Sequence, residues 1–181
     1  FYVSKVDAYD SAHLLKKLGR VRVRFTPLLA TNRFRQTLVL REGAIAIEAG
    51  DVRLRVWVDA HAPVIRVTGE TKTPVDVVAS FETLRPCAEL DDQASRLAWG
   101  YRNATSEWIK RVRSQNTPEF AAKVADPILN RTSGCRLSGE GLVRADKRSL
   151  KLAASRKVDL SVRVASSQTP TLAQWFGELE Q

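Results

Sequence analysis

The chain has 181 residues, of which 44% are hydrophobic and 27% are charged, and its formal net charge is +9 at pH 7. These values suit one globular domain with an apolar core, and they exclude disordered, coiled-coil and collagen-like chains. No segment approaches the roughly 20 consecutive apolar residues of a membrane span. Two cysteines are too few for a disulfide scaffold.

The first half of the chain alternates between apolar and polar residues, which predicts β-strands. Residues 51–59 are the clearest case, because apolar residues from Val52 to Val58 occupy one face while Arg53 and Arg55 lie on the other. Strands at this spacing, with turn residues between them, are typical of an antiparallel β-sandwich or barrel. The other predicted strands of this half are 20–25, 34–41, 43–49, 63–71 and 75–84, the last two separated by a turn at Lys72-Thr73-Pro74.

The middle of the chain changes character. Residues 88–95 are polar and acidic, and residues 97–103 are predicted to be extended. Short helices are predicted over 106–113 and 118–125, and Pro127 ends the second of them. Long excursions inside a sandwich are usually functional surfaces or covers between domains.

The last third of the chain is again predicted to form strands, and near its end the spacing of the apolar residues changes from that of a strand to that of a helix. Apolar residues from Leu172 to Leu179 are spaced as on one face of a helix, and Thr171 and Gln174 stand at the positions of a capping box. Such an amphipathic helix either folds back on the sandwich or leads into a next domain. The predicted strands of this part are 135–145, 148–154 and 158–165.

We therefore predict a mainly β protein, an antiparallel β-sandwich with short helices in a long excursion and a C-terminal amphipathic helix. The sandwich domain is expected to span residues 1–168, followed by a helical exit or linker over 169–181. The chain contains no Met and opens on strand-like residues at Phe1. We expect from this that it is part of a larger sequence and that N-terminal strand material is missing.

A search for chemical groups finds no complete catalytic set. His13 and His61 belong to no recognisable ligand set, and no nucleophile elbow, phosphate loop or dinucleotide fingerprint is present. Cys87 and Cys135 are expected to be buried small side chains, with their pairing left open. Glycosidase chemistry needs two carboxylates that flank the bond, but the acidic residues here are expected to be structural or solvent-facing. These candidate carboxylates are Asp59, Glu82, Glu107 and Glu140. We predict no catalytic, metal or cofactor site.

Two aromatic stretches are candidate surfaces. Trp57 shares a strand face with Arg53 and Arg55, and a ring beside charges can stack on a sugar. We favour the alternative that this face packs within the protein, with arginine stems covering the ring. The stretch Trp99–Trp108 combines aromatic and hydrogen-bonding side chains. That mixture suits carbohydrate binding and suits an interdomain contact equally well.

Seven stretches of the chain carry a family resemblance. They are Phe1–Tyr9, Leu14–Val23, Phe34–Leu38, Gly50–Ala60, Tyr101–Trp108, Arg131–Gly134 and Leu137–Val143. In the same order, they resemble the N-terminal region of the domain-of-unknown-function family 5703, and the resemblance spans nearly the whole chain.

Members of that family look like the front domains of glycoside hydrolases similar to family 95 α-L-fucosidases. The resemblance implies a supersandwich, galactose-mutarotase-like, followed by a helical linker and an (α/α)6 barrel that holds the catalytic acid and base. It also implies that Tyr101, Arg102, Asn103 and Trp108, which match the family's aromatic-Arg-Asn stretch, form a substrate-binding loop at the cleft. The chain departs from the family by lacking the Gly-rich segment before Phe1 and the barrel, so the isolated chain is expected to be inert.

The expected function is therefore that of a noncatalytic front sandwich of a glycoside hydrolase, with its own helical barrel and carbohydrate as partners. A freestanding carbohydrate-binding module is the alternative. The positive charge also suggests nucleic-acid binding through the arginines of 20–24 and 53–55. These strands lack the interleaved exposed aromatics of single-strand binders, so no nucleic-acid partner and no membrane partner are expected. A periplasmic or secreted location is favoured over a cytoplasmic one.

Overall fold

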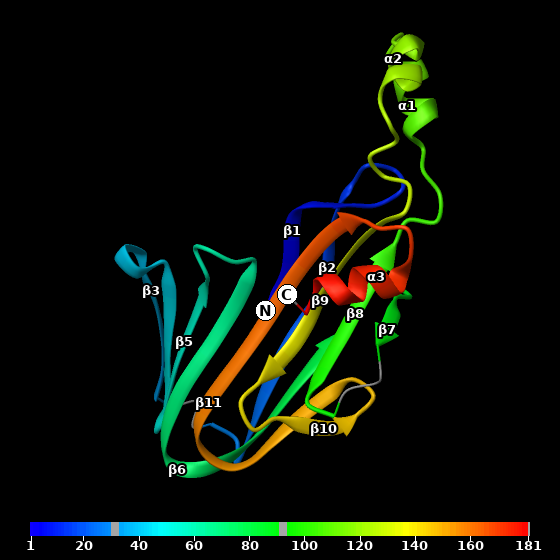
Figure 1. The fold of residues 1–181 in the computed structure, drawn as a ribbon. Helices are drawn as coiled ribbons and strands as arrows, with labels where there is room; N and C mark the ends of the chain where they lie inside the picture. The colour runs from blue at the N-terminus through cyan, green and yellow to red at the C-terminus, as the bar shows by residue number, and fades with distance from the viewer. Residues whose placement is uncertain (30–32, 91–93, 181) are drawn as a thin grey trace.

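The computed structural model describes residues 1–29, 33–90 and 94–180. Its strands form one hydrogen-bonded antiparallel sheet that is folded into two layers, which makes the protein a β-sandwich as predicted (Figure 1). The strands are β1 Tyr2–Tyr9, β2 Leu15–Thr26, β3 Phe34–Val39, β4 Ala44–Ala49, β5 Val52–Val58, β6 Val64–Glu82, β7 Ala88–Leu90, β8 Arg96–Arg102, β9 Arg131–Gly139, β10 Val143–Asp146 and β11 Ser149–Gln168. The helices are the 3-10 turn η2 Leu40–Glu42 and the α-helices α1 Trp108–Ser114, α2 Pro118–Lys123 and α3 Leu172–Glu178.

Two long strands, β6 and β11, belong to both layers. The first part of β6 (64–71) pairs with β5 and with the later part of β11, whereas its second part (75–82) pairs with β2 and with the start of β11. Register irregularities between Leu152 and Lys157 mark the point where β11 changes layer, and such bulges bend a strand. Figure 1 shows both strands curving at the same end of the molecule.

The prediction of a turn at Lys72-Thr73-Pro74 is therefore wrong, and so is the division of 148–165 into two strands. Pro74 lies inside β6, in the short stretch that has no partner in β11. Proline has no backbone N–H to donate and is tolerated where a strand bulges. The apparent turn residues thus mark the bend between layers rather than the end of a strand.

The long layer has the strand order β3-β4-β5-β6-β11-β9-β8-β7, and the short layer is built from β1, β2, the second part of β6, the start of β11, and β10. The core lies between them. Trp99 of the long layer is fully buried, its ring stacks on Phe81 of the short layer with centroids 4.3 Å apart, and its Nε1 donates to the backbone oxygen of Leu18 at 2.7 Å. One side chain therefore joins the two layers by both packing and a hydrogen bond.

Helix α3 is the predicted amphipathic helix, and it lies on the outer face of β8 and β9. The predicted capping box at its start is formed by Thr171 and Gln174. Its buried Trp175 packs against Gly100 and Gly134. A Cβ atom on Gly134 would lie 2.0 Å from the Trp99 backbone oxygen and 2.7 Å from the Trp175 ring, so both the strand contact and the helix contact require glycine there.

The apolar face of the long layer is covered at one end only. Leu137 of β9 is fully buried and Val67 of β6 is 3% exposed, whereas Leu38 of β3 is 63% exposed on the same face. Between them lies an apolar groove of about 260 Å³ at the open side of the sandwich. Its lining includes Phe1, Val21, Val23, Ile47, Leu54 and Val56. No helix in the described part of the chain is long and apolar enough to cross a membrane.

Candidate functional site

The segment between β8 and β9 projects beyond the end of the sandwich, and we call residues 104–129 the helical excursion (Figure 1). It contains α1 and α2, as predicted, with Pro118 in the first turn of α2, where its missing N–H costs nothing. Both helices are shorter than the length at which helices are stable on their own. They must therefore be held by contacts with the rest of the chain.

The base of the excursion is held by Asn103 and Asp126. Asn103 donates from Nδ2 to the backbone oxygen of Tyr9 at 2.9 Å. Asp126 Oδ1 accepts from the backbone N–H of Ile128 at 2.8 Å and from Ser106 Oγ at 3.1 Å. Burial acts to raise the pKa of Asp126, but these hydrogen bonds outweigh it and hold the pKa below its ordinary value. The carboxylate thus fixes the two ends of the excursion to each other.

The turn between β1 and β2 supports the excursion from one side. Trp108 lies parallel to His13, with ring centroids 5.8 Å apart. Glu107 donates its backbone N–H to Ser11 at 2.9 Å, and Arg111 Nη2 donates to the Ala12 oxygen at 2.7 Å. These contacts join segments almost 100 residues apart in the sequence.

The excursion also presents apolar side chains to solvent. Phe120 is 50% exposed and Ile109 is 44% exposed, and Val124 and Leu129 are also exposed. Only Val112 of the two helices is buried. Exposed apolar side chains that gather on one projecting element, rather than singly, mark contact surfaces.

Tyr101 and Arg102 serve other parts of the fold. Tyr101 is 8% exposed, and the Arg85 guanidinium lies over its ring at 4.0 Å. Arg102 donates to Thr132 Oγ1 at 3.0 Å and to the backbone oxygen of Thr169 at 2.8 Å, which ties β8 to the chain that leads into α3.

The four predicted substrate-binding residues thus divide into two pairs. Asn103 contacts Tyr9 and Trp108 contacts His13, so both lie against the segment that joins β1 and β2, whereas Tyr101 packs in the core and Arg102 anchors the approach to α3. Each has a structural contact, and their role toward a substrate stays a prediction.

Two of the candidate carboxylates, Asp59 and Glu82, have structural partners. Asp59 pairs with Arg66 at 3.1 Å, and Glu82 accepts from Arg22 and Arg20, whose hydrogen bonds lower the pKa of Glu82 to about 2. Among the described residues, no group of three or more His, Cys, Asp and Glu side chains is placed to hold a metal ion.

Both cysteine thiols are free. Burial raises the pKa of Cys87 to about 11, and burial also raises the pKa of the fully buried Cys135 far above its ordinary value. Both are therefore protonated and poorly reactive near pH 7. Cys135 behaves as the small buried side chain that was predicted.

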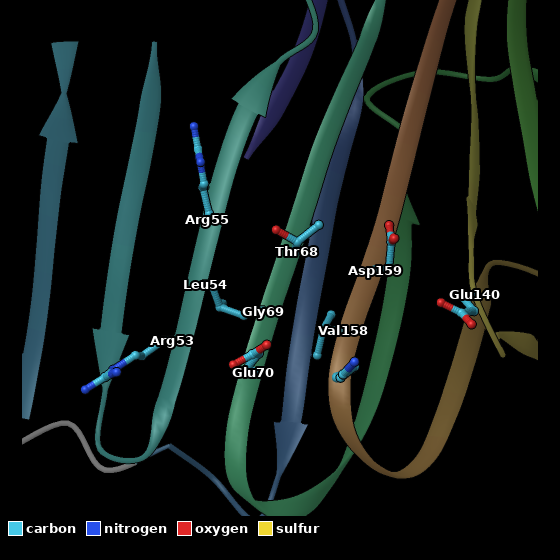
Figure 2. A pocket seen from close by; sticks show the side chains of 10 residues that line it. Arg53, Leu54, Arg55, Thr68, Gly69, Glu70, Glu140, Val158 and Asp159 are labelled. Carbon is cyan, nitrogen blue, oxygen red and sulfur yellow. The ribbon is translucent and has the colours of Figure 1, made fainter. Parts of the chain in front are cut away.

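A polar trough of about 520 Å³ crosses the outer face of the long layer (Figure 2). The strand register brings Arg55 of β5, Thr68 of β6 and Asp159 of β11 side by side across three strands. Glu140, from the turn after β9, closes one side. The polar residues around the trough are Arg53, Arg55, Thr68, Glu70, Glu140, Lys157 and Asp159. The sequence alone does not reveal this hollow, because its residues become neighbours only through strand pairing.

Trp57 lies beyond the trough on the same strand face. Its ring is half-buried, and the Arg55 guanidinium lies over it at 5.2 Å. This cation–π contact agrees with the favoured interpretation that an arginine covers the ring. The other part of that interpretation, that this face packs within the protein, is wrong, because Arg53 and Arg55 are exposed around the trough. Trp57 therefore does not offer a bare aromatic platform.

Comparison with known protein families identifies the family of this chain. The model of the N-terminal family described as "Domain of unknown function (DUF5703)" matches residues 1–94, which is just over half of the 181 residues. The chain belongs to this family. In the DUF5703 chain the matched part runs from β1 through β7, and the helical excursion and all four predicted substrate-binding residues lie beyond it. No curated protein matches the sequence.

Proposed function

We propose that this chain is the noncatalytic front sandwich of a glycoside hydrolase, and that its helical excursion docks on an (α/α)6 barrel of the same polypeptide. The observation that carries the proposal is the excursion itself. Hydrogen bonds of Asn103 and Asp126 hold its base, yet Phe120 and Ile109 are exposed to solvent. An element held this way is suited to make a contact with another domain rather than with its own sandwich.

Three further features support this proposal. The fold is a β-sandwich, the chain belongs to DUF5703, and the sequence resembles the front domains of glycoside hydrolases similar to family 95 α-L-fucosidases. In this arrangement the barrel supplies the acid and base, and the sandwich supplies Asn103 and Trp108 at the edge of the cleft. The isolated chain is then inactive, and the function of the sandwich is to position the barrel.

The excursion can be tested in the full-length protein with Phe120→Asp and Ile109→Asp. A displacement of about 1 Å at a cleft can cost roughly 100-fold in rate, so we expect kcat/KM for the best aryl glycoside to fall by roughly 10- to 100-fold. The control is Val6→Asp, because Val6 is 80% exposed on β1 and lies outside the excursion. Equal activity of all three variants, or robust turnover by the isolated chain, would contradict the proposal.

The polar trough favours a second candidate function, a freestanding carbohydrate-binding module. Saccharide hydroxyls need donors and acceptors together, and the trough supplies both from Arg55, Thr68 and Asp159. Calorimetry with a panel of neutral oligosaccharides tests this reading, with Asp159→Ala as the trough variant and Trp108→Ala as the excursion variant. A heat of binding that disappears with Asp159→Ala but not with Trp108→Ala would identify the trough as the binding site. No heat of binding with any sugar would rule out this second function.

A further inference from the structure

Two arginines face each other on the outer face of the long layer. Arg136 of β9 is the direct partner of Arg163 of β11 in the strand register. Arg96 of β8 lies diagonally beside Arg136, since it pairs with Ser138, two residues further along β9. Like charges placed directly opposite each other destabilise a sheet. The fold therefore keeps a local repulsion at this position.

Only one of these three arginines has an acidic partner among the described residues. Arg96 forms an ion pair with Glu180 at 2.7 Å. Within residues 1–29, 33–90 and 94–180, Arg136 and Arg163 have neither an ion pair nor a hydrogen bond to their guanidinium groups, and Nε of Arg136 is buried without an acceptor. Burial, followed by the charges of Arg96 and Arg163, lowers the pKa of Arg136, and the charge of Glu180 opposes this shift without cancelling it. A buried donor that lacks an acceptor is costly and calls for an explanation.

Two hydroxyl groups complete the patch. Ser138 and Ser161 are register partners, next to the two arginines on the same strands and the same face, and their Oγ atoms lie 3.0 Å apart. The two arginines and two serines thus form a square of hydrogen-bond donors. The forked guanidinium group is suited to bind two oxygens of one carboxylate or phosphate group.

We propose that Arg136 and Arg163, flanked by Arg96 and the two serines, form an oxyanion-binding site. The ligand is a small molecule or sugar that carries a carboxylate or a phosphate group. One anion between the two guanidinium groups removes their mutual repulsion and supplies the acceptor that Nε of Arg136 lacks. This site is independent of the helical excursion, so it does not depend on the proposed function.

The test is calorimetry and thermal unfolding of the 181-residue chain with sodium phosphate and sodium glucuronate, against sodium chloride at matched ionic strength. We expect saturable binding of at least one oxyanion and a rise in Tm that chloride does not give. Arg136→Gln or Arg163→Gln removes charge-assisted hydrogen bonds, which corresponds to roughly tenfold weaker binding or more. Arg163→Lys keeps the charge but loses the fork, so an intermediate loss is expected.

Arg22→Gln is the matched control for the loss of one positive charge, because Arg22 lies in β2 of the short layer and is already paired with Glu82. It should leave the dissociation constant within about twofold. Binding of glucuronate alone identifies a carboxylate ligand, and binding of phosphate as well identifies a general oxyanion site. Arg136→Gln should also raise Tm in chloride buffer, because it relieves the repulsion. No saturable binding of either anion, or equal loss with Arg22→Gln, would overturn the proposal.

Discussion

The two ends of the long layer have the same alternating pattern but very different surroundings. At the β8–β9 end, the inner face packs against the short layer through Trp99, and the outer face is covered by Trp175 of α3. At the β3–β4 end, Phe34 and Leu38 continue the same inner face, but they are 58% and 63% exposed. Alternation in a sequence thus specifies which face is apolar, and it does not specify what covers that face.

This difference has an energetic meaning. Burial of apolar area contributes roughly 25 cal/mol per Å² removed from water, so the covered end supplies most of the hydrophobic stability of the layer. The β3 end, by contrast, is an edge strand with exposed apolar side chains, which is a common site for contact with other chains. Substitutions at matched positions can measure how far the two ends differ.

The largest effect is expected for Trp99→Ala. It removes a fully buried ring, the stack on Phe81 and the hydrogen bond to Leu18. Loss of such a side chain costs about 3–5 kcal/mol of unfolding free energy, which urea denaturation measures. Trp99→Phe serves as the comparison, because it keeps the stack but leaves the Leu18 oxygen without a donor. If Trp99→Ala lost less unfolding free energy than Trp99→Phe, the Trp99 ring would not be what joins the two layers.

A leucine-to-alanine series follows the gradient across the layer. Leu137→Ala, at a fully buried position, is expected to cost about 2–5 kcal/mol. Leu54→Ala, at the apolar groove, is expected to cost about half as much. Leu38→Ala, at a 63% exposed position, is expected to stay within about 0.5 kcal/mol. Equal costs at all three positions would mean that the β3 end is covered in solution.

Helix α3, which covers the outer face of β8 and β9, can be destabilised at its N-terminal cap. Thr171→Ala removes the side chain that accepts from the Gln174 backbone N–H, and such a change costs about 1 kcal/mol. We expect increased solvent exposure of Trp175, seen as a red shift in fluorescence, while Thr171→Ser should retain the cap. Unchanged stability and fluorescence would indicate that packing of Trp175 alone holds α3.

The smallest effect concerns the ion pairs that fasten β2 to β6. Hydrogen bonds from Arg22 and Arg20 lower the pKa of Glu82 to about 2, from an ordinary value of 4.5. Because the folded-state pKa is depressed, this contribution is fully present above about pH 4.5 and is lost as the pH falls toward 2. Glu82→Gln should flatten the pH dependence of Tm in that window. Near pH 7 to 8 the slope of Tm against pH should stay the same as in the unmodified protein. An identical acid transition in both proteins would contradict this assignment.

The strands and helices were largely predictable because their periods are local. The alternation of β5 and the helical spacing before Leu179 appear within ten residues, and both elements are present as predicted. Pro74 misled the prediction because a proline marks a bend as readily as a turn, and only the partner strand distinguishes the two.

The candidate site was less predictable because its contacts are long-range. Tyr101 continues the inward alternation of Leu97 and Trp99, so its burial was visible in the sequence. The partners of Arg102 and Asn103 are 67 and 94 residues away, and no local pattern identifies them. The polar trough and the Arg136–Arg163 pair likewise depend on strand register, which the alternation leaves open.

The sharing of β6 and β11 between the two layers has a consequence for how the molecule is made. Val67 can find Leu160 only after more than 90 intervening residues have been synthesised, and the same two strands must also complete the opposite layer. Contacts so distant along the chain slow folding. Because both layers contain parts of β6 and β11, neither is complete without β11. The nascent protein is therefore expected to stay exposed to chaperones and proteases until β11 emerges from the ribosome.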